Sequence, residues 1–266
     1  MVLGERIGLG RTAEVFAWGD DRVLKLFFDW MPADVIEREA TIGGAVAVAG
    51  LPAPRVFGLE TVENRQGIVY ERVCGELMQT RIMRRPWRVM HLAREMAAIH
   101  AQVHAAALDD ALPAQREHLQ WAINATDALD DAARAAVLST LDRLPDGEVV
   151  CHGDLHPENV MLTARGPVVI DWLNASRGHA LADVARTVVM IAWGGGSPND
   201  RGSIAERVLR HFRVLLLDAY VRHYCQLAAV TRAEIEAWLV PVMAARLREN
   251  IPGERAVLLR EIKRRL

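Results

Sequence analysis

Cys151-His152-Gly153-Asp154-Leu155-His156-Pro157-Glu158-Asn159-Val160 places two histidines, two acids and an asparagine within eight consecutive positions. Short apolar runs flank this stretch at 149–150 and 160–162, and they predict a strand on either side of a polar loop. A further apolar run, 168–170, leads into Asp171. So many titratable and amide side chains on one loop indicate chemistry rather than packing.

Two oxygen-bearing side chains, Asn159 and Asp171, lie at the ends of neighbouring predicted strands. Mg²⁺ favours one or two protein oxygens together with the oxygens of a substrate phosphate. Asn159 and Asp171 are therefore candidate metal ligands, and Asp154 between the two segments is free to act as a base.

The first part of the chain has the pattern of strands interrupted by one helix. Turn residues separate β-branched or aromatic runs at 2–8, 13–18 and 22–28, which predicts an antiparallel meander. Pattern and composition predict a helix over 32–49, two more strands at 56–59 and 67–73, and a joint at Cys74-Gly75.

Beyond Gly75 the composition shifts toward Ala, Leu and Arg at helical spacing, with a helix expected over 86–107. Four helices are expected over 180–266, with breaks at 194–198, 231 and 252–253. The chain is accordingly expected to be α+β, with its strands mostly in the first part.

These segments resemble a known family. His152 to Met161 followed by Val168 to Trp172 resembles the catalytic and metal-binding segments of the aminoglycoside phosphotransferase and choline kinase group. The resemblance implies a two-lobed protein-kinase-like fold. Its N-terminal nucleotide-binding lobe, residues 1–73, would be a small antiparallel sheet with one helix. Its C-terminal lobe, residues 74–266, would be larger, mainly helical, and hold the catalytic and acceptor-binding groups.

The resemblance also implies a role for each matched residue. By this comparison Asp154 is the catalytic base, while Asn159 and Asp171 hold Mg²⁺. The nucleotide-binding residues it implies are Gly8 and Gly10 in a phosphate loop, Lys25 on the phosphates, Glu39 pairing with Lys25, and the backbone of Glu71 and Val73 at the adenine edge. Asp183 matches a later structural aspartate.

The implied activity is an ATP- or GTP-dependent, Mg²⁺-requiring transfer of the γ-phosphoryl group to a hydroxyl of a small molecule. The acceptor stays open between an antibiotic, such as an aminoglycoside or macrolide, and a metabolite alcohol such as choline, a sugar or an amino-acid hydroxyl. A metal-dependent hydrolase using His152, Asp154, His156 and Asp171, and a nucleotide-binding pseudokinase, are the alternatives. A protein kinase is disfavoured because only 12 positions separate Asp171 from Asp183, too few for a peptide-supporting activation segment.

Composition limits which binding partners and which cellular compartment we expect. The 266 residues carry 32 basic and 34 acidic side chains, and 51% are apolar, as in an ordinary globular protein. The near-neutral balance gives no reason to expect nucleic acid, and no apolar run approaches a membrane span. Three cysteines without CxxC spacing favour the reducing cytoplasm. The oligomeric state stays open.

Other residues are expected to have structural or solvent-facing roles. His100 and His104, four positions apart, are expected on a helix surface, and Cys151 as a small buried apolar residue. His156 is expected to brace the loop. The tail from Ala245 to Leu266 has seven basic and three acidic residues and is expected to be a solvated helix face.

Overall fold

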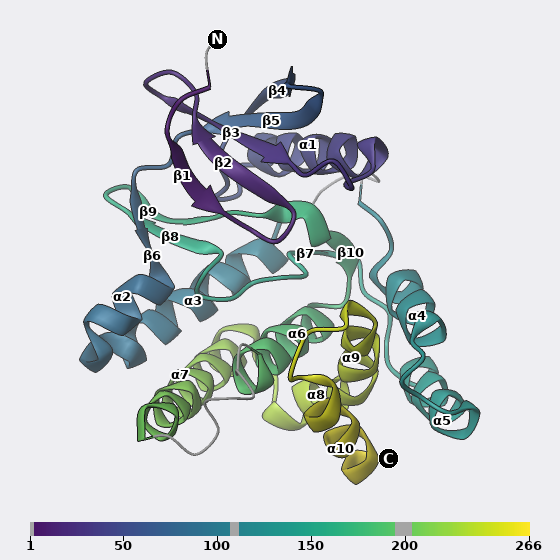
Figure 1. The fold of residues 1–266 in the computed structure, drawn as a ribbon. Helices are drawn as coiled ribbons and strands as arrows, with labels where there is room; N and C mark the ends of the chain where they lie inside the picture. The colour runs from purple at the N-terminus through teal and green to yellow at the C-terminus, as the bar shows by residue number, and fades with distance from the viewer. Residues whose placement is uncertain (1–2, 107–111, 195–203) are drawn as a thin grey trace.

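A five-stranded antiparallel sheet with one helix against it forms one part of the molecule, and a mainly helical part lies below it in Figure 1. The computed structural model describes residues 3–106, 112–194 and 204–266, with side chains in the last range from position 211 onward. The expectation of an α+β fold is confirmed.

The sheet has the strand order β1-β2-β3-β5-β4. Its strands are β1 (Arg6–Leu9), β2 (Ala13–Ala17), β3 (Arg22–Phe27), β4 (Val56–Val62) and β5 (Arg65–Glu71). Successive side chains of a strand face opposite sides of a sheet. Leu24 and Leu26 of β3 are fully buried in a cluster with Trp18, while Phe27 packs in a second cluster with Ile36 of the helix. This alternation turns Lys25 toward the helix.

That helix is α1 (Ala33–Val48), close to the expected range 32–49. It follows Pro32 and ends where Gly50 adopts a positive φ of 74°. A left-handed glycine just beyond the last turn is a common helix stop, since glycine has no Cβ to clash. Ile36, Ile42 and Val46 are buried on one face of α1, and Glu39 lies buried on it as well.

The second part contains the remaining elements. Its helices and turns are α2 (Met78–Arg84), η1 (Pro86–Arg88), α3 (Val89–His104), α4 (Gln115–Ala125), α5 (Asp131–Asp142), η2 (Trp172–Asn174), α6 (Ala180–Trp193), α7 (Ile204–Ala228), α8 (Arg232–Ala237), α9 (Leu239–Arg246), η4 (Leu247–Glu249) and α10 (Arg255–Arg265). Its short strands are β6 (Gly75–Leu77), β7 (Val149–Cys151), β8 (Val160–Thr163), β9 (Gly166–Val169) and β10 (Ser176–Gly178).

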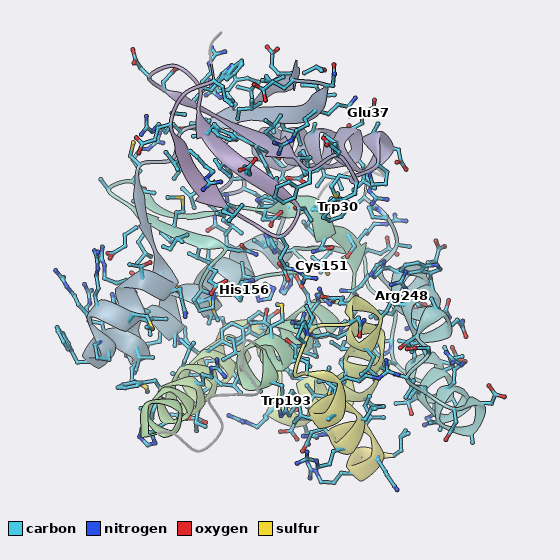
Figure 2. The ribbon with its side chains drawn as sticks, in the orientation of Figure 1. Trp30, Glu37, Cys151, His156, Trp193 and Arg248 are labelled. Carbon is cyan, nitrogen blue, oxygen red and sulfur yellow. The ribbon has the colours of Figure 1, made fainter. Side chains whose placement is uncertain are left out.

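Two small sheets frame the polar loop. β7 pairs with β10, and β8 lies between β6 and β9. The loop from His152 to Asn159 leaves β7 and enters β8. Cys151 and His156, at its start and middle, lie between the large sheet above and the helices below (Figure 2). The strands expected on either side of the loop are therefore present.

Two expectations about the elements need correction. Five α-helices, rather than four, lie in the described part of 180–266, because α8 and α9 divide at Trp238. Pro241 explains the division: it has no N–H to bond back into α8 and fits only the first turn of a new helix. The first strand begins at Arg6. Residues 1–2, where the first strand was expected to start, and 195–198, in the expected break between helices, lie outside the described residues.

The described helices were compared with the length and hydropathy of membrane-spanning helices. Among them, none combines the length and the apolar character needed to cross a bilayer.

Candidate active site

The polar loop is held in place by one face of α6. Asp183 accepts hydrogen bonds from the backbone N–H groups of His152 (2.6 Å) and Gly153 (2.9 Å). Thr187 donates its hydroxyl to the carbonyl of Leu155 at 2.7 Å, and Arg186 donates to the carbonyl of Gly153. Positions three and four apart share a helix face, so a single helix fixes three residues of the loop, His152, Gly153 and Leu155.

Gly153 is required by the shape of this loop. Its φ is +76°, and a Cβ at this position would lie 2.2 Å from the carbonyl oxygen of Asn174. No other residue fits without moving the backbone. This explains a glycine in a loop where side chains otherwise carry function.

His152 faces the interior. Its Nδ1 accepts from the N–H of Asp154 at 3.1 Å, and its Nε2 lies 3.2 Å from the carbonyl of Ile170. Burial lowers the pKa of His152, so the ring stays neutral. Both ring nitrogens are engaged with backbone. Among the described residues, His152, Asp154, His156 and Asp171 do not form a group of three or more metal ligands; the group of that kind that the structure contains is His100, His104 and Asp183.

Asp154 is partly accessible in the loop, with 22% of its side chain exposed. Its Oδ2 accepts a hydrogen bond from the Asn159 amide at 3.0 Å and lies 3.6 Å from His156 Nε2. Burial alone would raise the pKa of Asp154, but His156 and the Arg186 cation outweigh it, and the pKa falls below its usual value. Asp154 is therefore ionised at neutral pH.

Lys25 joins the two parts of the molecule. Its Nζ lies 2.7 Å from Glu39 Oε1 on α1 and 3.0 Å from Asp171 Oδ1 after β9. The Lys25–Glu39 pair is the one that the family resemblance implies. Burial opposes the ammonium charge, but the Asp171 and Glu39 carboxylates together raise the pKa of Lys25. Lysine is therefore a fixed cation at the junction.

Glu39 is almost completely buried, at 1% exposure. Tyr70 donates its hydroxyl to Glu39 Oε1 at 2.9 Å, while Oε2 is buried without a hydrogen-bond partner. Burial raises the pKa of Glu39 despite the nearby ammonium of Lys25. The carboxylate is thus held at an energetic cost, as is usual for a group kept for function.

Asn159 and Asp171 are neighbours through the backbone. The N–H of Ile170 bonds to the carbonyl of Asn159 at 2.9 Å, which continues the β8–β9 ladder to the residue before Asp171. Asp171 has φ +63° and ψ +68°, a strained left-handed conformation for a residue with a Cβ, and its side chain is 42% exposed. An amide and an accessible carboxylate side by side fit the donor set of Mg²⁺.

The glycine hairpin lies at the β1–β2 turn. The N–H of Gly10 bonds to the carbonyl of Ala13 at 2.8 Å. A Cβ at Gly8 or Gly10 would approach no closer than 3.4 Å to its neighbours, so local packing does not demand glycine at either position. Glu71 ends β5, and its side chain binds Arg165 at 2.8 Å rather than facing a ligand. Val73 is half-buried just after it.

The histidine pair is buried, which overturns the expectation of a helix surface. His100 and His104 point their Nε2 atoms at Asp183 Oδ2, at 3.0 and 3.3 Å. Their Nδ1 atoms meet the hydroxyls of Tyr220 (2.6 Å) and Tyr224 (2.7 Å) on α7. The matching four-residue spacing of the two tyrosines was the available sequence signal. These groups fix the aspartate that in turn fixes the loop.

The basic tail also differs from expectation. Arg246 is buried and forms a two-bond ion pair with Glu254, at 2.6 and 2.9 Å, rather than facing solvent. Glu249 lies 2.7 Å from Arg186 and 3.2 Å from Arg246. The C-terminal segment thus reaches the arginine beside Asp154, a contact that no motif in the sequence indicates. Cys151 is fully buried, as expected.

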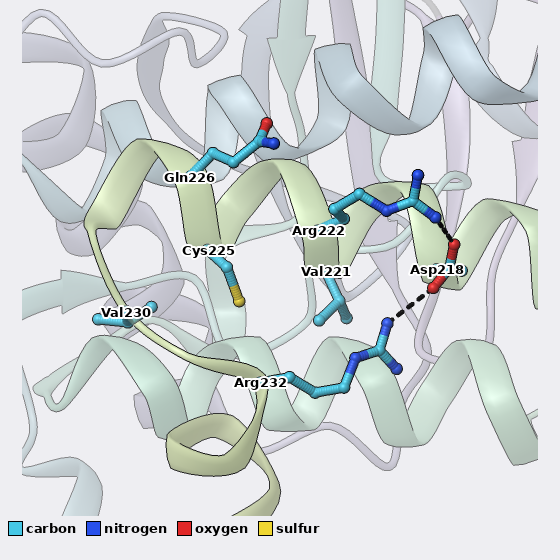
Figure 3. A pocket seen from close by; sticks show the side chains of 7 residues that line it. All are labelled: Asp218, Val221, Arg222, Cys225, Gln226, Val230 and Arg232. Carbon is cyan, nitrogen blue, oxygen red and sulfur yellow. Dashed lines mark hydrogen bonds and ion pairs between the residues drawn. The ribbon is translucent and has the colours of Figure 1, made fainter.

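A cavity of about 460 Å³ opens between α7 and α8 and includes none of the predicted site residues (Figure 3). Asp218 pairs there with Arg222 and Arg232. Glu234 caps α8 through Thr231. These acids are engaged locally and do not gather around Asp154.

Comparisons with known proteins agree with this geometry. The model of one family, described as "Phosphotransferase enzyme family", matches residues 4–238. A comparison with curated proteins gives no match.

Solved structures show the same fold. One is a thermostable mutant of aminoglycoside phosphotransferase APH(4)-Ia, with 18% identity, a TM-score of 0.64, and coverage of 98% of this chain and 94% of that one. Another is amicoumacin kinase hAmiN in complex with AMP-PNP, Ca²⁺ and Ami, with 15% identity, a TM-score of 0.64, and coverage of 96% and 85%. A choline/ethanolamine kinase family protein from Mesorhizobium loti has 19% identity, a TM-score of 0.54, and coverage of 99% and 86%.

Proposed function

This chain belongs to the phosphotransferase enzyme family, as expected of a small-molecule kinase, and we propose that it moves the γ-phosphoryl group of ATP or GTP to a hydroxyl of a small molecule. The observation that carries this proposal is that Asp171, which pairs with Lys25 of the first part, lies one residue after Ile170, whose carbonyl approaches the same His152 ring that accepts from the N–H of Asp154. We also propose residues 1–73 as the nucleotide-binding lobe and 74–266 as the catalytic and acceptor-binding lobe.

The nucleotide is held by charge and by backbone. Lys25, fixed by Glu39, neutralises phosphate oxygens, while the hairpin that contains Gly8 and Gly10 lies over the phosphates as the phosphate loop. The backbone at Glu71 and Val73 meets the base. The hAmiN complex with AMP-PNP, a protein of the same fold, supports a nucleotide as donor.

Asp154 orients the acceptor hydroxyl and takes its proton. Its Oδ2 is engaged by Asn159, so Oδ1 is the oxygen left to receive the hydroxyl hydrogen bond. Phosphoryl transfer depends mainly on alignment and charge neutralisation, so an ionised, rigidly held carboxylate is what the reaction needs.

Asn159 and Asp171 are the residues that would hold Mg²⁺. A bound Mg²⁺ neutralises phosphate charge as it develops. Lys25 pairs with Asp171, which gives that carboxylate a counter-charge.

The acceptor is proposed as a class. An antibiotic such as an aminoglycoside or macrolide, or a metabolite alcohol, fits the chemistry; the named relatives include enzymes for both kinds. Free cysteines at all three positions are consistent with work in the cytoplasm.

The test is a coupled assay of nucleotide consumption, with ATP and with GTP, against aminoglycosides, macrolides, amino alcohols and sugars. Turnover that depends on one acceptor and disappears in Asp154→Ala supports the proposal. Turnover near the wild-type rate in Asp154→Ala would remove Asp154 from the reaction. Product analysis by phosphorus NMR should find the phosphoryl group on a hydroxyl of that acceptor.

A further inference from the structure

Arg186 lies between two carboxylates that belong to distant parts of the chain. One of its terminal nitrogens lies 2.7 Å from Glu249 Oε1, and the other lies 3.8 Å from Asp154 Oδ1. The first distance is a charge-assisted hydrogen bond, and the second is too long for one. The guanidinium is 18% exposed, so water screens it little.

The oxygen that Arg186 approaches is the one that the reaction needs. Asp154 Oδ2 already accepts from Asn159, which leaves Oδ1 for the acceptor hydroxyl. A guanidinium presents five donors in a planar fork and readily binds a carboxylate through two of them. If Arg186 closed on Asp154, it would occupy Oδ1 and compete with the acceptor.

Glu249 binds one terminal nitrogen of Arg186, while the Nε of Arg186 donates to the Gly153 carbonyl. Glu249 comes from η4, immediately after α9, and lies beyond residue 238, where the match to the family ends. Its second oxygen pairs with Arg246, which is itself anchored on Glu254. Glu249 therefore sits on a rigid base and can hold the guanidinium at a fixed position.

We propose that Glu249 is a positioning residue that keeps Arg186 off the reactive oxygen of Asp154. This inference rests on the proposed function, because it gives Oδ1 of Asp154 the acceptor hydroxyl. It assigns the C-terminal segment a part in phosphoryl transfer, although that segment carries no motif.

The first experiment compares crystal structures of the wild type and Glu249→Ala. The guanidinium should move from its present 3.8 Å to within about 3 Å of Asp154 Oδ1 in the variant. Arg246 keeps both bonds to Glu254, so the variant retains its fold. An arginine that stays in its wild-type place would overturn the proposal, whatever the enzyme's activity.

The second experiment measures turnover. It uses the acceptor identified in the coupled assay or, if none is found, water as the acceptor of the phosphoryl group. Glu249→Ala should lower kcat by about tenfold or more, because the base becomes occupied, with nucleotide KM changed by less than about twofold. Glu261→Ala, which removes an ion pair with Arg264 on α10, is the matched control and should keep the wild-type kcat.

Combining Arg186→Gln with Glu249→Ala gives the decisive test. Arg186→Gln removes the cation and keeps a side-chain amide that can donate to the Gly153 carbonyl. The double variant Arg186→Gln/Glu249→Ala should recover kcat relative to Glu249→Ala alone. A further loss would mean that Arg186 assists Asp154 directly, which contradicts the proposal. If the wild type itself turns over neither acceptor nor water, the proposed function fails, and the crystal structures still decide the position of Arg186.

Discussion

At the junction of the two parts, a buried acidic side chain depends on a neighbouring basic one for its counter-charge. Glu39 is buried with one unbonded oxygen, and Lys25 is the cation that compensates it. Removing one partner of a buried ion pair leaves an uncompensated charge, which costs more than the pair contributes. We therefore expect the Lys25–Glu39 pair to be required for stability and, under the proposed function, for nucleotide binding as well.

Lys25→Met should lower the free energy of unfolding by about 3 kcal/mol, because it leaves the Glu39 carboxylate buried without its cation. Lys25→Met/Glu39→Leu should recover part of that loss, since both charges are gone. Urea denaturation measures both values. Neither variant should bind nucleotide as the wild type does. A single variant as stable as the wild type would show that Glu39 needs no counter-charge.

At the scale of elements, hydrogen bonds from α6 hold the polar loop, and side chains of α3 and α7 in turn hold Asp183 of α6. Asp183 of α6 receives both histidines of α3, and each histidine meets a tyrosine of α7. Burial is the main cause that lowers the pKa of His100, to about 4, with the neighbouring His104 acting in the same direction. This network therefore depends on a neutral imidazole ring at His100.

Stability should consequently fall as the pH drops from about 6.5 toward 4. In that window the unfolded chain protonates this histidine and the folded chain does not, so protons favour unfolding. Each such histidine adds a slope of up to about 1.4 kcal/mol per pH unit, and His152, whose pKa burial also lowers, acts with the same sign.

Urea denaturation across this pH range measures the slope. His100→Gln should reduce it by about one proton, whereas His91→Gln, at an exposed position on α3, should leave it unchanged. A slope that is identical in His100→Gln and the wild type would contradict a neutral, buried His100.

The ion pair between Arg246 of α9 and Glu254 before α10 holds the C-terminal helices together. Both side chains are under a tenth exposed. Glu254→Gln should therefore lower the free energy of unfolding by about 3 kcal/mol. The same change at Glu261, whose partner Arg264 is 62% exposed, should cost less than about 1 kcal/mol. Equal losses in the two variants would contradict the structural role of the buried pair.

Local patterns predicted the strands of the first part, the helix after them and the two strands that flank the loop, but not α2, α4 or α5. The Lys25–Glu39 pair was implied by the family resemblance rather than by local spacing. Burial of His100 and His104 did not follow, because their partners Tyr220 and Tyr224 lie 120 positions away on α7. The contact of Glu249 with Arg186 depends likewise on how α9 packs, which no local spacing specifies.

At the scale of the whole molecule, the two parts meet at charged side chains from both. Lys25 and Glu39 come from the sheet and α1, while Asp171, Asp154 and Arg186 come from the second part. The C-terminal segment returns to this junction through Glu249. The proposed active site thus draws on residues from nearly the whole length of the chain rather than on its central motif alone.

The central claim is that two acids have separate tasks: Asp171 holds the metal–nucleotide complex, and Asp154 acts on the acceptor. Calorimetric titration of nucleotide, with and without Mg²⁺, tests it most directly in the wild type, Asp171→Asn and Asp154→Asn. The account predicts Mg²⁺-dependent binding in the wild type, its loss in Asp171→Asn, and its retention in Asp154→Asn. Mg²⁺-dependent binding in Asp171→Asn with wild-type affinity would contradict the account.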